Sequence, residues 1–342
     1  MLLNDKQCVT FDIEVLKNCF LCTTYNMETN ELKTFEVSER KNEISELINF
    51  FIHNKYYFVG YNNIHYDTPI INFCIKYFYD VKDHNIITTS IYNMSNVIVS
   101  DTEYDLWKEY KFADNFLQID LMTMLYSKAL RVSLKELQVT MNYKNVQEMK
   151  VDWNKDIELS KIDELISYNI NDVMSTSELL SRCEKDLQLR LSIEKEYGIK
   201  CMSKDGVGIG TELLKQKYLQ ATGLTWNDIK DLRSPMDYIP LKDVILPQIS
   251  YSTPVLQSLL EELKISVVSP GRKGLERHFI LDGRLISIGV GGIHSKNNPE
   301  IIIPQNDELL LDCDAASLYP SLLIEYGFYP PHLGKEFVDI YK

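Results

Sequence analysis

The chain of 342 residues lacks several features that would assign it to a simple class. No apolar run is long enough to span a membrane, and the start, MLLNDKQCVTFDIEV, has no basic region ahead of an apolar stretch, so no signal peptide is apparent. Basic residues are scarce, since 36 Lys and Arg stand against 49 Asp and Glu, for a net charge of −13. We therefore expect no protein coated with DNA-binding surface, and any nucleic-acid groove must be local or be completed by another chain.

Paired cysteines of the kind that hold zinc are missing as well. The seven Cys are scattered, and the closest pair, Cys19 and Cys22, lies in the apolar run CFLCTTY without a second pair or a nearby His. We interpret these thiols as strand and core side chains. Reduced thiols fit a cytoplasmic location, which for a viral chain is the host cytoplasm or a phage replication compartment.

What is present is an ordinary globular composition, 45% hydrophobic and 25% charged, and a length that predicts about two domains. VTFDIEV alternates strictly, which predicts a strand with Phe11, Ile13 and Val15 on one face and Asp12 and Glu14 on the other. Further strands are expected at FLCTTYN, LKTFEV and YYFVGY, and helices at SERKNEISELINFFIHN (capped by Ser38), DTPIINFCIKYFYD, SLKELQVTMNY and, as one long helix, IDELISYNINDVMSTSELLSRCEKDLQLRLSIEKEYG. This pattern predicts a mixed α/β (α+β) fold.

The chain reads as more turn-rich from Gly198 onward, with GVGIG and SPGRKG as expected turns. Helices are expected at Thr211–Thr222 and Thr253–Leu263, a hairpin through Asp282-Gly283, a strand at DELLLDCD and a helix after Ser317. We therefore expect a first domain over residues 1–195, a helical connecting region over 196–275 and a final segment over 276–342.

Acidic side chains recur at spacings that bring them to one face. Asp12 and Glu14 lie two apart on the first strand, and two anions on an apolar strand are costly without a cation or donor. Asp67 follows a buried strand at a helix start, and Tyr168 and Asp172 lie four apart on one helix face. Taken alone, these pieces read as a solvated strand face, a helix cap and a surface Tyr.

Together, D-I-E, N-x-x-x-Y-D and Y-x-x-x-D resemble the DEDD exonuclease superfamily, whose fold is ribonuclease-H-like. The tyrosine subtype matches, because the histidine subtype needs His where Ser167 stands. The resemblance implies a 3′→5′ exonuclease that holds two Mg²⁺ or Mn²⁺ ions about 4 Å apart. By the same resemblance, Asp12 bridges both metals, Glu14 and Asp172 hold the metal that activates water, and Asp67 supports the other. Tyr168 would orient that water or the phosphate.

The same resemblance proposes residues that contact DNA. Asn62 would touch the terminal nucleotide, with Asn63 as a rival because YNNIHYD admits either alignment. Ser133 and Leu134 in RVSLKEL are similar to an element that contacts single-stranded DNA in protein-primed phage polymerases, although Ser133 also suits a plain helix start. Lys150 in EMKVDW lies where such enzymes place a basic residue near the scissile phosphate.

A second motif lies near the end of the chain. DAASLYPS, residues 314–321, closely resembles motif A of family B DNA polymerases, D-x-x-S-L-Y-P-S. The resemblance implies that Asp314 binds the catalytic metals, that backbone amides after it, including those of Ser317 and Leu318, cradle the triphosphate, and that Tyr319 selects deoxynucleotides. GVGGIHS stands where these polymerases carry Y-x-G-G, so Gly291 and Gly292 would approach the template closely, unless the segment is an ordinary Gly-rich hairpin.

The sequence has no K-x-x-x-N-S-x-Y-G and no D-T-D-S, which are motifs B and C of that family. We therefore expect an N-terminal portion of a phage-type polymerase, an exonuclease domain followed by a partial palm, which polymerises only with a second chain that carries the missing motifs. A truncated polymerase would read the same. The alternatives are a free-standing 3′→5′ exonuclease with a vestigial palm and a non-catalytic replisome scaffold. The expected partners are DNA and the second chain, without a membrane.

Overall fold

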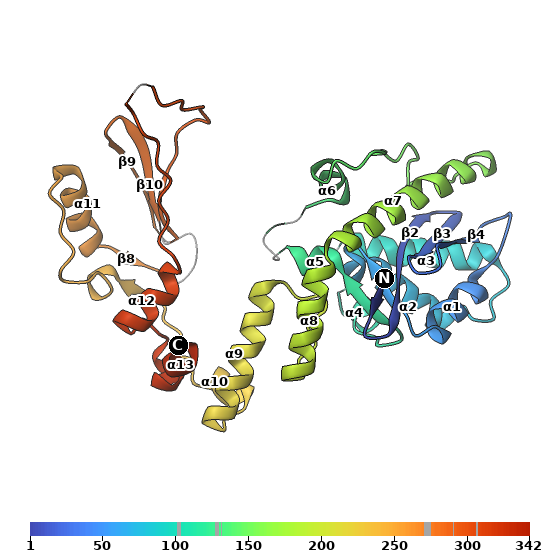
Figure 1. Ribbon diagram of the computed structural model, residues 1–342, viewed down its shortest axis with the longest axis horizontal. Helices are drawn as coiled ribbons and strands as arrows, with labels where there is room; N and C mark the ends of the chain where they lie inside the picture. Colours follow the sequence, from blue (N-terminus) through green and yellow to red (C-terminus); the bar gives the residue numbers. More distant parts are fainter. Residues whose placement is uncertain (101–103, 127–129, 131, 270–274, 290, 306) are drawn as a thin grey trace. The chain divides into compact units, whose positions relative to one another are not determined.

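The computed structural model describes the chain apart from residues 101–103, 127–129, 131, 270–274, 290 and 306. It forms two compact units, Met1–Gln216 (unit 1) and Lys217–Lys342 (unit 2), which can be followed by colour in Figure 1. Most of the expected turn SPGRKG, Val290 of GVGG and Arg131 of RVSLKEL lie outside the described residues. The expected three-part division at residues 195 and 275 stays a prediction.

Unit 1 is built around a mixed sheet in the order β4-β3-β2-β5-β6, with β1 paired to β2. Its strands are β1 (Leu2–Leu3), β2 (Lys6–Leu16), β3 (Cys19–Asn26), β4 (Glu31–Val37), β5 (Tyr57–Gly60) and β6 (Leu117–Asp120). Strands β2, β3 and β4 pair antiparallel, whereas β2, β5 and β6 pair in parallel. The strands expected at the start of the chain are thus confirmed, and so is the mixed α/β fold class.

The helices of unit 1 pack on its sheet or on one another. They are α1 (Ile44–His53), α2 (Asp67–Tyr77), α3 (His84–Val99), α4 (Tyr104–Lys111), α5 (Leu121–Leu125), α6 (Leu134–Thr140), α7 (Ile162–Arg182) and α8 (Glu184–Tyr197). Helix α9 (Gly206–Thr222) begins in unit 1 and ends in unit 2, since the division falls after Gln216. The odd-numbered side chains of β2, Val9 to Val15, join a buried core with α1, α2 and α3. The even-numbered side chains therefore project to the other face, where α7 packs along β2 and β3 (Figure 1).

Two of the helices expected in unit 1 differ in detail from the prediction. Ser38 does not cap the first helix, because α1 begins only at Ile44, and the Ser38 hydroxyl instead donates to the Glu36 carboxylate. The long helix is broken at Cys183, where α7 ends and α8 begins one residue later. The Cys183 amide donates to the carbonyl oxygens of both Leu179 and Leu180, as is common where a helix ends.

The stretch GVGIG, expected as a turn, lies in the first turn of α9. The carboxylate of Asp205 accepts a hydrogen bond of 2.8 Å from the Gly208 amide, so it satisfies one of the free donors at the helix start. The hydrogen bond to Asp205 thus favours a helix in a segment whose glycines have low helix propensity.

Unit 2 combines short helices with small sheets. Its elements are α10 (Trp226–Asp231), β7 (Ile239–Pro240), α11 (Pro254–Lys264), β8 (Val267–Val268), β9 (Glu276–Leu281), β10 (Arg284–Gly289), β11 (Gly292–Ser295), α12 (Leu318–Tyr326) and α13 (Gly334–Tyr341). Strands β9, β10 and β11 form one antiparallel sheet. The predicted hairpin is confirmed, with Asp282 and Gly283 both at positive φ, 48° and 76°, as a tight turn of this kind requires.

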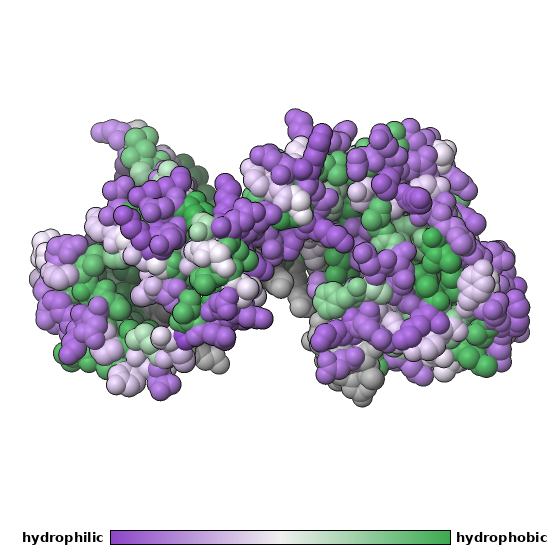
Figure 2. Space-filling view, turned by 90° about the horizontal axis from the view of Figure 1, so that it is seen from below, coloured by the Kyte–Doolittle hydropathy of each residue, from purple (hydrophilic) through white to green (hydrophobic). Residues whose placement is uncertain are grey.

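The strand expected at DELLLDCD is not formed, because residues 307–314 pair with no strand of the described chain. An apolar run becomes a strand only when a neighbouring strand takes up its backbone hydrogen bonds. Here Leu309, Leu310 and Leu311 remain 77, 60 and 68% exposed. On the face of the molecule in Figure 2, apolar side chains likewise lie among hydrophilic ones at the surface of both units.

Candidate metal centre

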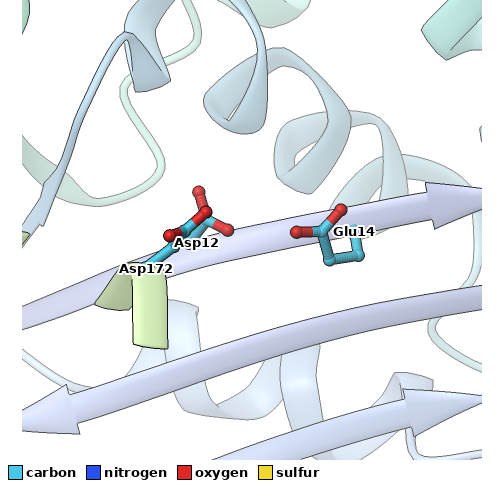
Figure 3. Close-up of side chains that lie close together, drawn as sticks. All are labelled: Asp12, Glu14 and Asp172. Atoms are coloured by element: carbon cyan, nitrogen blue, oxygen red, sulfur yellow. The ribbon is translucent and has the colours of Figure 1, made fainter. Parts of the chain in front are cut away.

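Three carboxylates from two elements of unit 1 meet at one point. Asp12 and Glu14 project from the same face of β2, and Asp172 approaches them from α7 (Figure 3). One oxygen atom of each lies within 4.8 Å of the others, which makes them a group that could hold a metal ion. The period of two along a strand and the packing of α7 across it produce this convergence.

Asp67 is the fourth acidic residue of the site. It is the first residue of α2, is 5% exposed, and accepts a hydrogen bond of 3.2 Å from the amide of Ile13, between the two acids of β2. Its negative charge acts on both of those neighbours, although it is not a member of the closest group of three. The structure therefore places the fourth predicted carboxylate beside the other three.

Burial and neighbouring charges raise the pKa values of Asp12, Glu14 and Asp67. Burial raises the pKa of Asp12 most, and the charges of Asp67, Glu14 and Asp172 raise it further. Burial, followed by the charges of Asp172 and Asp67, raises the pKa of Glu14 to about 8, and burial raises that of Asp67 to about 7. Because the charged forms are disfavoured without a counter-charge, a bound cation would stabilise this arrangement strongly.

Three donors that the sequence analysis missed surround the acids. Lys135 of α6 donates to Oδ1 of Asp172 at 2.5 Å, and Gln138, one turn later, donates to the same oxygen at 3.1 Å. Asn169 of α7 donates to Oδ2 of Asp12 at 2.7 Å. Lys135 and Gln138 follow Ser133 in the helix expected there, and Asn169 follows Tyr168, but a single Lys, Gln or Asn in a helix gives no signal of its own.

The two buried amides also leave oxygen atoms unsatisfied. Among the residues that the structure describes, neither Oδ1 of Asn169 nor Oε1 of Gln138 has a hydrogen-bond partner, and both side chains are fully buried. Buried polar atoms without a partner are uncommon and need an explanation, such as an ion or a water molecule. Both amides touch the acidic cluster, so this observation fits a metal centre.

Tyr168 lies beside the cluster, one helical turn before Asp172. Its ring is partly buried, and the ammonium of Lys135 stands 4.5 Å from the ring centroid. Burial, followed by the charges of Asp172 and Glu14, raises the pKa of the phenol well above its usual value. Tyr168 therefore stays protonated and can donate a hydrogen bond to a bound anion.

The structure separates the two rival asparagines. Asn63 is fully buried, and its amide lies within hydrogen-bonding distance of Thr68 and Gln118. Asn62 is partly exposed, with φ of 64°, a left-handed conformation that Asn tolerates. The geometry therefore leaves Asn62 as the one able to reach a ligand, while Asn63 holds the loop.

The other DNA-contact candidates of unit 1 are Ser133, Leu134 and Lys150, and each has different surroundings. Ser133 caps α6, where its hydroxyl and the Glu136 carboxylate form a reciprocal capping box, and Leu134 is partly buried. The predicted helix start at Ser133 is thus confirmed. Lys150 is exposed, 3.6 Å from Glu164, and with Tyr168 it lines an open cavity of about 300 Å³.

The candidate residues of motif A all lie in unit 2, on the surface. Tyr319 is 76% exposed, Leu318 is 50% exposed, and Asp314 and Ser317 are exposed as well. Ser317 precedes α12 with φ of 52°, and its carbonyl accepts a hydrogen bond from Ser321. Within the described part of the chain, Asp314 belongs to no acidic group that could hold a metal.

The predicted glycine pair also lies in unit 2. Gly291 and Gly292 are exposed where β10 turns into β11, and Gly292 has a φ of 136°. A side chain is disfavoured at that angle, so this glycine is needed for the turn itself. This glycine therefore suits the hairpin, and the close approach of Gly291 and Gly292 to a template strand stays a prediction.

No helix within the described residues combines the length and the apolar character that a membrane span requires. Comparison with known proteins finds no matching family model, no matching curated protein and no matching solved structure. What can be said about function therefore comes from the residues and geometry of this chain.

Proposed function

We propose that unit 1 is a metal-dependent 3′→5′ exonuclease of ribonuclease-H-like fold that removes nucleotides from single-stranded DNA ends. The observation that carries the proposal is the meeting of Asp12, Glu14 and Asp172 within 4.8 Å, with Asp67 beside them. Oxygen ligands of this kind suit Mg²⁺ or Mn²⁺. The spacing in the sequence that resembles the tyrosine subtype of the DEDD exonucleases supports the same reading.

In this proposal, the role of each side chain is the one that the resemblance to the DEDD exonucleases implies. Asp12 would contact both ions, whereas Glu14 and Asp172, whose oxygen atoms lie within 4.8 Å of that of Asp12, would hold one of them. A pair of divalent ions supplies charge neutralisation for the phosphate and lowers the pKa of water. The protonated phenol of Tyr168 would donate to the phosphate or to the attacking water.

The surroundings of Tyr168 support a nucleotide as the ligand. The cavity that it lines with Lys150 has a volume of about 300 Å³, which lies at the lower end of the range for small-molecule sites. Lys150, which lines the cavity with Glu148 and Glu164 and lies 3.6 Å from Glu164, would offer a positive charge for a phosphate group. Asn62 and the α6 start with Ser133 and Leu134 remain further candidates for contact with the DNA end.

The test is hydrolysis of 5′-labelled single-stranded DNA with Mg²⁺ or Mn²⁺ by the whole chain and by Asp12→Asn. We expect the wild-type chain to shorten the DNA from its 3′ end, and we expect a rate at least roughly 100-fold lower for the variant, since a central metal ligand is lost. Asp12→Asn also removes one of four crowded charges, so it should unfold at the same temperature or higher. Equal cleavage by both proteins would refute the site.

For unit 2, we propose a partial palm that polymerises DNA only with a second chain. The supporting observation is that residues 307–314, just ahead of the Asp314 motif, form no strand in the described chain and expose three leucines. A strand supplied from another chain would cover them. Co-purification with a chain carrying D-T-D-S, and incorporation that needs both chains and is lost in Asp314→Asn, would support this.

The alternatives predict different results in the same assays. A free-standing exonuclease cleaves DNA, but no second chain restores nucleotide incorporation. A non-catalytic replisome scaffold neither cleaves nor incorporates, alone or with its partners. Incorporation by this chain alone would contradict the proposed division of catalytic residues between two chains.

A further inference from the structure

Lys135 brings a positive charge into contact with the acidic cluster. Its ammonium is 2.5 Å from Oδ1 of Asp172, a member of the closest group of three acids. The same ammonium stands 4.5 Å from the centroid of the Tyr168 ring. Its charge also counteracts the rise in the pKa values of Asp12 and Glu14. Lys135 thus reaches the carboxylates from α6, a helix that carries none of them.

The two donors to Asp172 differ in their freedom to move. Gln138 is fully buried and also lies 2.7 Å from the hydroxyl of Ser175, so it is fixed on two sides. The Lys135 side chain is 23% exposed and is tied to the site through its flexible methylene stem. Lys135 can therefore move away from Asp172 while Gln138 keeps its hydrogen bond to the same carboxylate. One lone pair of Asp172 Oδ1 then becomes free to bind an ion.

We propose that Lys135 is a resident counter-cation, which neutralises Asp172 while no divalent ion is bound, leaves it when an ion binds, and then contacts the phosphate of the substrate. The inference rests on the proposed function. A divalent ion and an ammonium that contact the same carboxylate repel each other, so binding of the ion must displace the ammonium. The displaced ammonium remains tethered at the partly exposed side of the cluster, next to the Tyr168 phenol, where it meets a phosphate group.

The first experiment measures Mn²⁺ binding without DNA, by calorimetry, for the wild-type chain, Lys135→Met and Lys76→Met. Lys76 is a matched control, because it pairs with Glu109 at 2.9 Å and stands 5.3 Å from the Tyr77 ring, outside the acidic cluster. We expect Lys135→Met to bind Mn²⁺ about tenfold more tightly, since no ammonium must be displaced, and Lys76→Met to be unchanged. Unchanged or weaker binding by Lys135→Met would overturn the exchange.

A second measurement is made on the wild-type chain and uses variants only to assign the resonances. In the wild-type chain labelled with ¹³C at the lysine ε-carbon, Mg²⁺ should shift the resonance of Lys135, identified by its absence from Lys135→Arg. A resonance of Lys135 that ignores saturating Mg²⁺ would refute the exchange. The Lys76 resonance, identified in the same way, should stay where it is.

Cleavage tests the contact with phosphate. At saturating Mn²⁺, Lys135→Met should cleave single-stranded DNA roughly tenfold more slowly, and Lys135→Arg should recover part of the rate, because it restores the charge. Equal rates for the wild-type chain and Lys135→Met would overturn this contact. If the wild-type chain binds Mn²⁺ but does not cleave DNA, the nuclease proposal fails, while the binding and resonance measurements still decide the exchange.

Discussion

At the scale of single residues, the site depends on amides as much as on acids. Asn169 donates to Asp12 and Gln138 donates to Asp172, so a neutral donor fixes the orientation of a carboxylate on each side of the cluster. Partners of this kind orient metal ligands and influence affinity for the ion. The carboxylates would otherwise be free to rotate, and their repulsion would favour turning apart.

We predict that Asn169→Leu, which keeps the volume and removes the donor, weakens Mn²⁺ binding about 10- to 100-fold. Asn171→Leu is the control, because it lies on the same helix and contacts Asn145, outside the acidic group. Calorimetry of both variants measures the difference. Equal affinity of Asn169→Leu and the wild-type chain would show that this amide does not orient Asp12.

A second residue-scale prediction concerns pH and stability. Burial alone would raise the pKa of Glu36, but hydrogen bonds from Arg40 and Ser38 outweigh it and hold the pKa below its usual value. A lowered pKa contributes stability above the unfolded-state value, about 4.3, and that stability is lost as the pH falls through the folded-state value. Asp12, Glu14 and Asp67 have raised pKa values and act in the opposite direction, but they do so equally in the wild-type chain and in Arg40→Met. As the pH falls below about 5, we therefore expect Arg40→Met to lose less in melting temperature than the wild-type chain loses.

Melting curves at a series of pH values test this. Arg182→Met serves as the control, since Arg182 pairs with Glu178 in the same (i, i+4) arrangement but at a more exposed position. The control should keep the full pH dependence. A parallel pH dependence for Arg40→Met and the wild-type chain would remove Glu36 as its source.

The sequence predicts the acids of the site but not the donors around them, and the reason is physical. Asp12 and Glu14 lie on the same face of their strand because side chains in a strand alternate with a period of two. Tyr168 and Asp172 lie on the same face of their helix because they are four residues apart. The bond from Asn169 to Asp12 joins residues 157 positions apart. No local period encodes such a contact, so only the packing of α7 on β2 reveals it.

At the scale of elements, one buried carboxylate holds the loop that carries the candidate DNA contact. Asp120, at the end of β6, is fully buried and accepts hydrogen bonds from the amides of Asn62 and Ile64 at 3.0 and 3.1 Å. It also accepts from the amides of Met122 and Thr123, at the start of α5. A single side chain therefore fixes both the loop after β5 and the helix after β6.

We predict that Asp120→Asn lowers the free energy of unfolding by about 3 kcal/mol, because an amide nitrogen cannot accept the bonds that the carboxylate accepts. Hydrogen exchange should accelerate at Asn62 and Ile64, while urea unfolding measures the total loss. Asp83→Asn, which changes the exposed cap of α3, should have a much smaller effect on both. Unchanged exchange at the loop amides would contradict this role.

Local patterns also explain which elements are predictable. The alternation of VTFDIEV and the Asp-Gly turn each match one structure, and both are confirmed. The sequence pattern does not predict helix α3, because β-branched and small polar residues fill HNIITTSIYNMSNVIV, and such residues have low helix propensity. Burial of Ile87, Ile91 and Ile98 on one side of the helix stabilises it despite that propensity. The strand at residues 307–314 was predicted wrongly because hydrophobicity does not provide a pairing partner.

At the scale of the whole molecule, the hydrophobic clusters found among the buried residues that the structure describes belong to unit 1, within residues 3–202. The acidic group and its donors lie there as well. Unit 2 contains fewer buried side chains and many exposed apolar ones. Stability and the candidate metal centre are therefore concentrated in the first unit.

We predict that residues 1–216 alone fold cooperatively and bind Mn²⁺ with the affinity of the full chain, within about twofold. Circular dichroism during heating and calorimetry measure the two properties. An unfolded product, or one that is folded but does not bind the ion, would show that unit 2 contributes to the centre. Equal affinity would assign the centre to unit 1.

The three consecutive exposed leucines, residues 309–311, should also lower the solubility of this chain. Side chains exposed by 60% or more in an unpaired backbone segment favour self-association as concentration rises. Expression of this chain without the second chain proposed above should therefore give more insoluble material than expression of the two together. In that proposal, solubility would set the ratio between the two chains, independently of any requirement for catalysis.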